Sequence, residues 1–345
     1  MDSSLLETAV DAKTPLLQSR LAEDGYVFVR GLLHSDLIGE IRELAARHLE
    51  AAGLASGKDH PIWSGRTPRD NELAPNGPIV SAVAEDCVIC RLAHSAKVVE
   101  FLERMIGDKV FAWTDCAARL RIMLGARADD TEASGPLRFS FSTPAHQDFY
   151  FFRPVDTFTC WVPLMEIDEL VGGLALRRHS HRDGLWATWW KGNEFLGVPA
   201  TASQANKWQQ DGAVPVAGKV EPSDKEDRSD RQWLRSDYHP GDALIFTGKM
   251  LHAGLPNRSE AIRLSVDVRY QLANSPLHWE ATTAGALTQA YFGEVLATLK
   301  DLQVPRGDFE LAWEAMRVAG PDPDRDVRER TKQVLDNIAS DAEQH

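Results

Sequence analysis

The sequence predicts a mainly β fold with flanking helices, in which the strands form a sandwich or a jelly roll. From about residue 110, short apolar runs bounded by turn residues dominate the chain, and several alternate or are rich in β-branched and aromatic residues. Helical periodicity precedes this region and returns from about residue 286. Spaced short strands of this kind are typical of sandwiches and jelly rolls.

The part before residue 110 is expected to be mostly helical. Asp24-Gly25 turns the chain into the apolar run 26–29, which is typical of a strand. Ser35 has the side chain of a good N-cap, and apolar residues at helical spacing follow it towards Gly53, which suits a helix stop. The remaining expected elements are an amphipathic helix at 16–23, a loop at 55–78 and a helical stretch at 79–106.

A long insertion interrupts the expected strands, which are 111–124, 157–164, 173–176, 243–247 and 264–272. The insertion, 186–235, is polar and has a charged run at 221–231, yet it carries five tryptophans. These tryptophans argue against plain disorder, so the insertion is either a lid over a substrate or a subunit contact. We expect a single domain over 1–345, with helical N-terminal support (1–109), a jelly-roll core (110–275) and a helical C-terminal tail (286–345).

Composition and charge narrow the class of protein. The chain has 345 residues, 43% of them hydrophobic and 26% charged, which is ordinary for a globular protein in water. A net charge of −13 argues against nucleic acid and anionic membrane surfaces as partners. No segment reaches the roughly 18 apolar residues of a membrane span. The first residues lack the pattern of a signal peptide, and the four cysteines do not resemble a disulfide framework, so we expect a cytoplasmic protein.

The motif His146-Gln147-Asp148 is the clearest indication of chemistry. A histidine and an aspartate two residues apart on an extended segment project from the same face and can bind one metal ion. His252, which follows an apolar strand and precedes a turn, is the best candidate for a third ligand. Two histidines and one carboxylate form a facial triad that leaves three positions open on a ferrous ion, two for a 2-oxo acid and one for O2.

A candidate anion clamp follows the third ligand. Arg263 lies eleven residues after His252, and Ser265 shares its face of a predicted strand. A planar guanidinium binds a carboxylate through two hydrogen bonds, so Arg263 suits the second carboxylate of a dicarboxylic 2-oxo acid. Arg269 is a rival for this role because a regular strand places it on the same face. The spacing from His252 favours Arg263.

Other metal-binding side chains are better explained by structural roles. His179 and His181 fall in one turn, and His239 precedes a proline in another. The CxxC motif Cys87-Val88-Ile89-Cys90, with His94 nearby, lacks the second CxxC that a zinc site of this type needs. Its apolar helical setting favours two buried cysteines.

Further motifs follow His146-Gln147-Asp148 in a fixed order. They are Trp161-Val162-Pro163-Leu164, Gly172-Gly173-Leu174, Ser180-His181-Arg182, Gly241-Asp242, His252, Pro256-Asn257-Arg258-Ser259 and Arg263. With the strand that follows Asp24-Gly25, these motifs make residues 15–275 resemble the phytanoyl-CoA dioxygenase family. The resemblance implies a double-stranded β-helix (jelly-roll, cupin-like) core, the cofactors Fe(II), 2-oxoglutarate and O2, and usually the hydroxylation of a small molecule.

The family's site residues carry over position by position. His146, Asp148 and His252 match its iron ligands, and Arg263 matches the residue that binds the distal carboxylate of 2-oxoglutarate, a contact to which we add Ser265. The resemblance also implies that Trp161 and Arg121 lie on strands that line the co-substrate pocket. The segment 177–181, Arg-Arg-His-Ser-His, replaces the commoner Pro-Gly-Ser-His, so the turn and the pocket wall there are expected to differ.

Several outcomes stay open for the same residues. Asp148 favours hydroxylation over halogenation, because related halogenases have Ala or Gly at this position. Desaturation, cyclisation or epimerisation would use the same ligands. An O2-independent jelly-roll isomerase would not need Arg263, and a non-catalytic binding protein would need neither the triad nor the clamp. A natural-product, amino-acid-like or acyl intermediate is the expected substrate, and the helical tail could support a homodimer.

Overall fold

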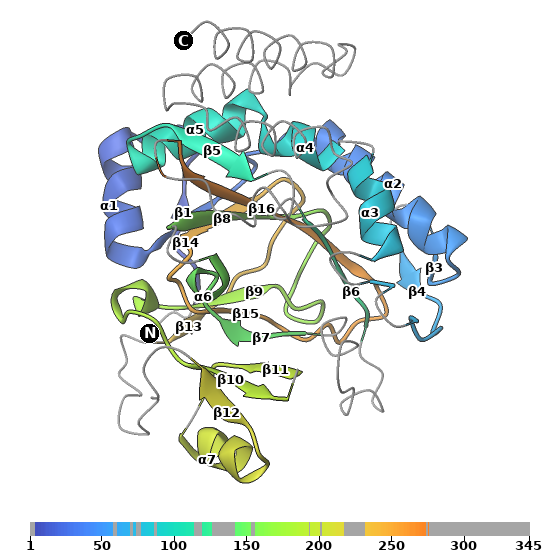
Figure 1. Ribbon diagram of the computed structural model, residues 1–345. Coiled ribbons are helices and arrows are strands. Elements are labelled where there is room, and N and C mark those ends of the chain that lie inside the picture. The colour runs from blue at the N-terminus through green and yellow to red at the C-terminus, as the bar shows by residue number, and fades with distance from the viewer. Residues whose placement is uncertain are drawn as a thin grey trace, which may run out of the picture.

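Two β-sheets that face each other form the centre of the structure (Figure 1). This computed structural model describes residues 4–57, 61–69, 72–73, 77–85, 88–113, 119–125, 142–152, 156–192, 194–200, 202–216, 232–273 and 275. The helical tail expected at 286–345 and the charged run at 221–231 lie outside the described residues. Among the described residues, no helix has both the length and the apolar character that a membrane crossing requires.

The larger sheet has the strand order β1-β2-β14-β8-β16-β5, and β6 also pairs with β16. Its strands are β1 (Glu7–Thr8), β2 (Tyr26–Val29), β5 (Val110–Trp113), β6 (Arg119–Met123), β8 (Thr157–Pro163), β14 (Ala243–Thr247) and β16 (Arg263–Leu272). The pairing of β1 with β2 is parallel and the other pairings are antiparallel. The sheet therefore includes β2, which precedes the start expected for the jelly-roll core at residue 110.

The smaller sheet has the order β13-β9-β15-β7 and is antiparallel throughout. Its strands are β7 (Thr143–His146), β9 (Leu174–Arg177), β13 (Trp233–Leu234) and β15 (His252–Gly254). Along the chain, β7, β8, β9, β14, β15 and β16 alternate between the smaller and the larger sheet. This winding is that of a jelly roll and confirms the predicted fold class.

Helices cover the outer face of the larger sheet (Figure 1). They are α1 (Thr14–Asp24), α2 (Ser35–Ala51), α3 (Pro78–Glu85), α4 (Val88–Ala93) and α5 (Ala96–Ile106). The helical stretch expected at 79–106 is thus not continuous, because Ser95 starts a new helix by accepting a hydrogen bond from the backbone N–H of Val98.

Two further expectations about the N-terminal part were wrong in detail. Ser35 is the first residue of α2 rather than its N-cap, since its hydroxyl donates to Asp36 and the extended backbone of His34 precedes the helix. The stretch expected as a loop at 55–78 contains a short hairpin, β3 (Ala55–Ser56) and β4 (Ile62–Trp63).

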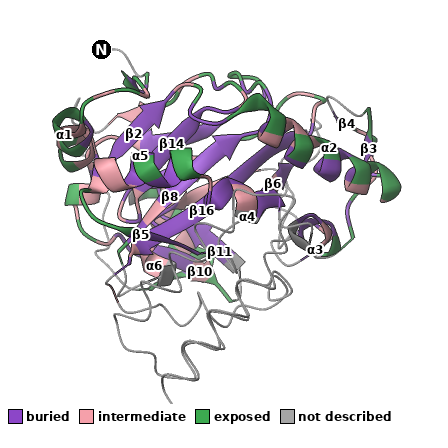
Figure 2. Cartoon of the chain, turned by 90° about the horizontal axis from the view of Figure 1, so that it is seen from above, coloured by how far each residue is buried: buried purple, intermediate pink, exposed green. Residues whose placement is uncertain are grey.

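Strand alternation divides the buried side chains into two apolar clusters. On β14, Ala243 and Ile245 pack towards the helices, while Leu244 and Phe246 pack between the two sheets. On β16, Leu264, Val266, Val268 and Tyr270 join the helix side, and the opposite face carries Arg263, Ser265, Asp267, Arg269 and Gln271. Figure 2 shows the strands of this central region as buried. The interior between the sheets is therefore apolar along β14 and polar along β16.

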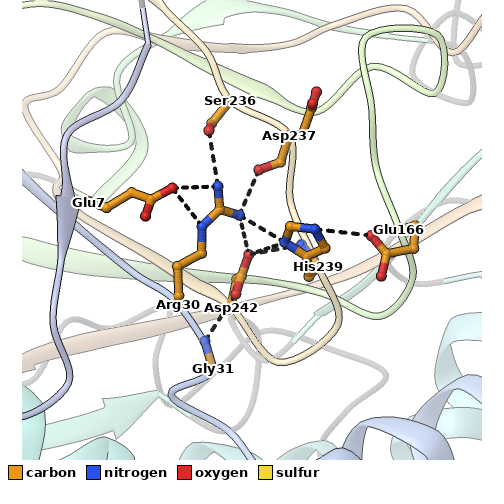
Figure 3. A network of polar contacts seen from close by, with 8 residues as sticks. All are labelled: Glu7, Arg30, Gly31, Glu166, Ser236, Asp237, His239 and Asp242. Carbon is orange, nitrogen blue, oxygen red and sulfur yellow. Dashed lines mark hydrogen bonds and ion pairs between the residues drawn. The ribbon is translucent and has the colours of Figure 1, made fainter.

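A polar network fastens the N-terminal strands to the turn before β14 (Figure 3). The Arg30 guanidinium donates to Glu7 and Asp242, at 2.7 Å each, and to the carbonyl of Asp237. Asp242 also accepts from the backbone N–H groups of Gly31 and His239. His239, considered above as a metal ligand, thus belongs to this surface network.

The insertion forms a small unit on the outer side of the smaller sheet (Figure 1). Its elements are β10 (Thr188–Lys191), β11 (Glu194–Gly197), α7 (Ala202–Gln210) and β12 (Val214–Val216), and its three strands pair in the order β11-β10-β12. The unit contacts the core where β11 lies against β7.

Candidate active site

The structure brings the three predicted metal ligands together. His146 ends β7 and pairs in register with His252, which begins β15, while Asp148 follows two residues after His146. One potential ligand atom from each residue lies within 4.8 Å of the others. The Nε2 atoms of His146 and His252 are 3.7 Å and 4.0 Å from Oδ1 of Asp148. All three side chains are buried.

Backbone carbonyls orient both imidazoles. Nδ1 of His146 lies 2.8 Å from the carbonyl of Pro144, and Nδ1 of His252 lies 3.0 Å from that of Met250. When Nδ1 donates to a carbonyl, Nε2 keeps its lone pair for a metal. Burial lowers the pKa of His146 to about 3 and also lowers the pKa of His252, so both rings are neutral near pH 7.

Asp148 is ionised and held by two further side chains. Burial by itself would raise the pKa of its carboxyl, but Arg269 and the two histidines outweigh burial and hold this pKa well below its usual range. Arg269 donates from Nη2 to Oδ1 at 2.9 Å and from Nε to Oδ2 at 3.1 Å. Thr159 donates to Oδ2 at 2.5 Å. The donor set of two neutral imidazoles and one carboxylate fits a ferrous ion.

Arg263 is a buried cation that forms no ion pair with any carboxylate of the described residues. Its side chain is 1% exposed. Nη1 donates to the backbone carbonyls of Gly172 and Leu255, Nη2 contacts the sulfur of Met123, and Nε has no partner among the described residues. Burial lowers its pKa to about 10, so the guanidinium remains charged near pH 7. A buried charge in this condition is costly unless an anion pairs with it.

The remaining predicted residues lie around the same face of β16. The indole N–H of Trp161 donates to the hydroxyl of Ser265 at 3.1 Å. Arg121 pairs in register with Ser265 and donates to Asp267 at 2.6 Å. Arg269 does not share the position of Arg263, since it is engaged with Asp148.

The other histidine and cysteine candidates do not join the cluster where they are described. His181 approaches the carbonyl of Ala22 at 3.3 Å, and His179 accepts a hydrogen bond from Arg178. His179 has a φ of 59°, so the turn at 177–181 has a left-handed residue where the family's commoner pattern has glycine. Cys87 lies outside the described residues, so the CxxC motif stays untested.

Gln147, for which no role was predicted, holds the start of the insertion. Its amide nitrogen donates to the carbonyls of Gly184 at 2.8 Å and Lys249 at 2.6 Å. Its amide oxygen accepts from the backbone N–H of Trp186 at 2.8 Å. Alternation along the strand points Gln147 away from His146 and Asp148, and that was the available signal of a different role.

The insertion also touches the strand that carries His146. The backbone N–H of Val198 donates to the carbonyl of Ala145 at 2.7 Å. The Phe195 ring stands edge-on to the His146 imidazole, with centroids 6.1 Å apart, and Trp190 packs on Phe195 at 5.1 Å. An aromatic pair of the insertion therefore lies next to the metal cluster.

Gly197 permits this close approach, and its replacement should disturb β7. Its φ is +85°, and a Cβ there would lie 2.6 Å from the carbonyl oxygen of Ala145. Gly197→Ala should cost about 1–2 kcal/mol for the left-handed backbone, plus the cost of moving β7, and should weaken metal binding. Gly192→Ala is the matched control, because Gly192 has a φ of +58° and open space around it. The free energy of unfolding is measured in urea. An equal loss of this free energy in both variants, together with unchanged metal affinity, would contradict the prediction.

A jelly roll with two histidines and a carboxylate at one end, and with a buried arginine that has no ion pair among the described residues, has the features of an iron- and 2-oxo-acid-dependent oxygenase. The chain belongs to the phytanoyl-CoA dioxygenase family: the family model described as Phytanoyl-CoA dioxygenase (PhyH) matches residues 21–265, well over half of the chain. The predicted family and enzyme class, a dioxygenase that uses Fe(II) and 2-oxoglutarate, are confirmed.

Named relatives and a solved structure agree with this membership. The chain is 29% identical over 282 residues to the 1-deoxypentalenic acid 11-beta-hydroxylase of Streptomyces exfoliatus, covering 78% of this chain and 87% of that protein. The enzyme of the same name from Streptomyces arenae is 28% identical over the same shares. The fold is similar to that of the epimerase SnoN, solved with Fe3+, alpha ketoglutarate and nogalamycin RO, with a TM-score of 0.50, 16% identity, and 79% of this chain and 90% of that chain covered.

Proposed function

We propose that the protein hydroxylates an unactivated C–H bond of a small natural-product intermediate, with Fe(II) held by His146, Asp148 and His252 and 2-oxoglutarate held by Arg263. The observation that carries the proposal is the buried Arg263 guanidinium, which among the described residues has no partner for Nε and no ion pair with a carboxylate. An O2-independent isomerase or a non-catalytic binding protein has no use for such a cation. The charge would be expensive to keep without an anionic ligand.

Different residues of the chain would hold the metal, bind the co-substrate and form the pocket wall. The two neutral imidazoles and the ionised Asp148 would hold the metal, which supplies O2 activation when bound. Arg263 would bind the distal carboxylate of the co-substrate, with Ser265 beside it, and Trp161 orients the Ser265 hydroxyl. Arg121, tied to Asp267, would form the neighbouring part of the pocket wall.

The aromatic side chains of the insertion are evidence for an apolar substrate. Phe195 and Trp190 present aromatic surface beside His146, where a substrate would have to sit to be oxidised. We therefore assign the insertion to the substrate side of the site rather than to a subunit contact. The relatives named for 1-deoxypentalenic acid support a carboxylic acid of this type as the substrate. The net charge of −13 supports the further proposal that nucleic acid is not a partner.

An anaerobic titration tests the cofactor assignment first. Fe(II) and then 2-oxoglutarate are added to the apo-protein while the weak visible metal-to-ligand absorption band is followed. The band should appear with wild-type protein and only when both are present. Bound iron without a band would contradict the 2-oxoglutarate assignment, and no iron binding would favour the non-catalytic reading.

The reaction outcome is then tested with 1-deoxypentalenic acid as the first probe. Succinate release with a product that has gained one oxygen atom would support hydroxylation. A product of unchanged mass would indicate epimerisation, and a product that has lost two hydrogen atoms would indicate desaturation or cyclisation. A panel of terpenoid and polyketide acids is then tested. If none of them stimulates succinate release, the result would count against this substrate class.

A further inference from the structure

Two neighbouring side chains of the larger sheet donate hydrogen bonds to the carboxylate of Asp148. Arg269 and Thr159 are direct cross-strand partners on β16 and β8, so their side chains stand next to each other on the inner face of the larger sheet. Both reach Asp148, which lies two residues beyond the end of β7 in the smaller sheet. The side chains of Arg269 and Asp148 are only 5% and 2% exposed.

The three hydrogen bonds are shared unequally between the two carboxylate oxygens. Oδ2 accepts from Thr159 and from Nε of Arg269. Among the described residues, Oδ1 accepts from Nη2 of Arg269 alone, and this same oxygen faces Nε2 of both histidines. A carboxylate oxygen has two lone pairs, so Oδ2 is saturated and Oδ1 retains one.

We propose that Arg269 and Thr159 are positioning residues that set the rotation of the Asp148 carboxylate, so that Oδ1 points to the histidines. The planar fork of arginine fixes the plane of the carboxylate, and the threonine hydroxyl fixes the rotation within that plane. Outer-shell partners of this kind orient metal ligands and contribute strongly to metal affinity. The edge of the Arg269 guanidinium formed by Nε and Nη2 is engaged with Asp148.

The inference rests on the proposed metal site, and its test uses metal binding rather than turnover. Thr159→Val keeps the shape and charge of the side chain and removes one hydrogen bond. Arg269→Lys keeps the charge and removes the planar fork. Because neither change alters the net charge near the metal, a change in affinity reports positioning. Each variant should bind Co(II) or anaerobic Fe(II) roughly 10–100-fold more weakly than wild type, and the Co(II) visible spectrum should change.

Two variants keep the test informative. Thr157→Val is the matched control, since Thr157 lies on the same strand face, is equally buried and has a hydroxyl with no described partner. It should retain wild-type metal affinity. Thr159→Ser retains the hydroxyl and should restore affinity. Thermal unfolding of each apo-variant shows whether it is folded.

The outcomes separate this inference from the proposed function. Wild-type Co(II) affinity and spectrum in both Thr159→Val and Arg269→Lys would overturn the positioning roles while leaving the metal site intact. An equal loss in Thr157→Val would also overturn them, because the effect would then be general to the strand. Wild-type protein that binds neither metal would instead refute the proposed function.

Discussion

Replacing His252 with alanine should abolish Fe(II) binding and, with it, oxidation of any substrate. His252 supplies one of only two nitrogen donors in the cluster, and its Nε2 lies 4.0 Å from Oδ1 of Asp148. Loss of a direct ligand should weaken metal affinity by more than the roughly 10–100-fold typical of outer-shell partners. Equilibrium titration of the apo-protein with Fe(II) under anaerobic conditions measures the change.

His181→Ala is the control for the loss of a histidine. His181 was a rival ligand, but it contacts the carbonyl of Ala22 and stands apart from the cluster. This variant should bind Fe(II) like wild type. If His252→Ala bound Fe(II) tightly and His181→Ala did not, the metal site would instead be assigned to the turn at 177–181.

Replacing Arg263 with methionine should remove 2-oxoglutarate binding while leaving metal binding intact. Truncating one partner of a buried charge pair costs about 2–5 kcal/mol, which is a roughly 30- to 5000-fold weaker Kd. The apo-variant should lose little stability, because the side chain it removes is a buried cation without a carboxylate partner. Thermal unfolding in the presence of Mn(II) is measured with and without 2-oxoglutarate. It reports both the stability of the variant and its binding of 2-oxoglutarate.

Wild-type protein in that experiment should gain stability from 2-oxoglutarate, about 2.7 kcal/mol at a concentration 100-fold above Kd. Arg263→Met should gain less than about 0.9 kcal/mol at the same concentration, the value for a roughly 30-fold weaker Kd. Arg258→Met, five residues earlier and with an exposed side chain, should gain as much as wild type. A full gain in Arg263→Met would show that the distal carboxylate binds elsewhere, with Arg121 the next candidate.

Local patterns allowed much of the site to be predicted. Spacing by two residues placed His146 and Asp148 on one face, and the strands 26–29 and 243–247 were found because each is a short apolar run bounded by turns. Alternation along β16 correctly placed Arg263, Ser265 and Arg269 on a common face. These predictions depend on periodicity within a single strand.

The partners of those residues could not be predicted in the same way. Arg269 and Asp148 are 121 positions apart and meet only because two sheets face each other. The register that sets Thr159 beside Arg269 is likewise a property of the assembled sheet. The break at Ser95 was missed because apolar spacing continues through it, while the capping hydrogen bond depends on one side chain.

The metal ligands and the anion clamp belong to different halves of the sandwich: His146 and His252 lie on the smaller sheet and Arg263 on the larger. A ligand that reaches both must span the interior, and packed sheets keep a nearly constant separation of about 10 Å. With the proposed metal ligands and clamp, the length of the co-substrate should therefore govern its binding. A five-carbon 2-oxo diacid can engage both ends, whereas a shorter one such as oxaloacetate would leave one end without contact. A bound diacid would also tie the two sheets together and resist their separation.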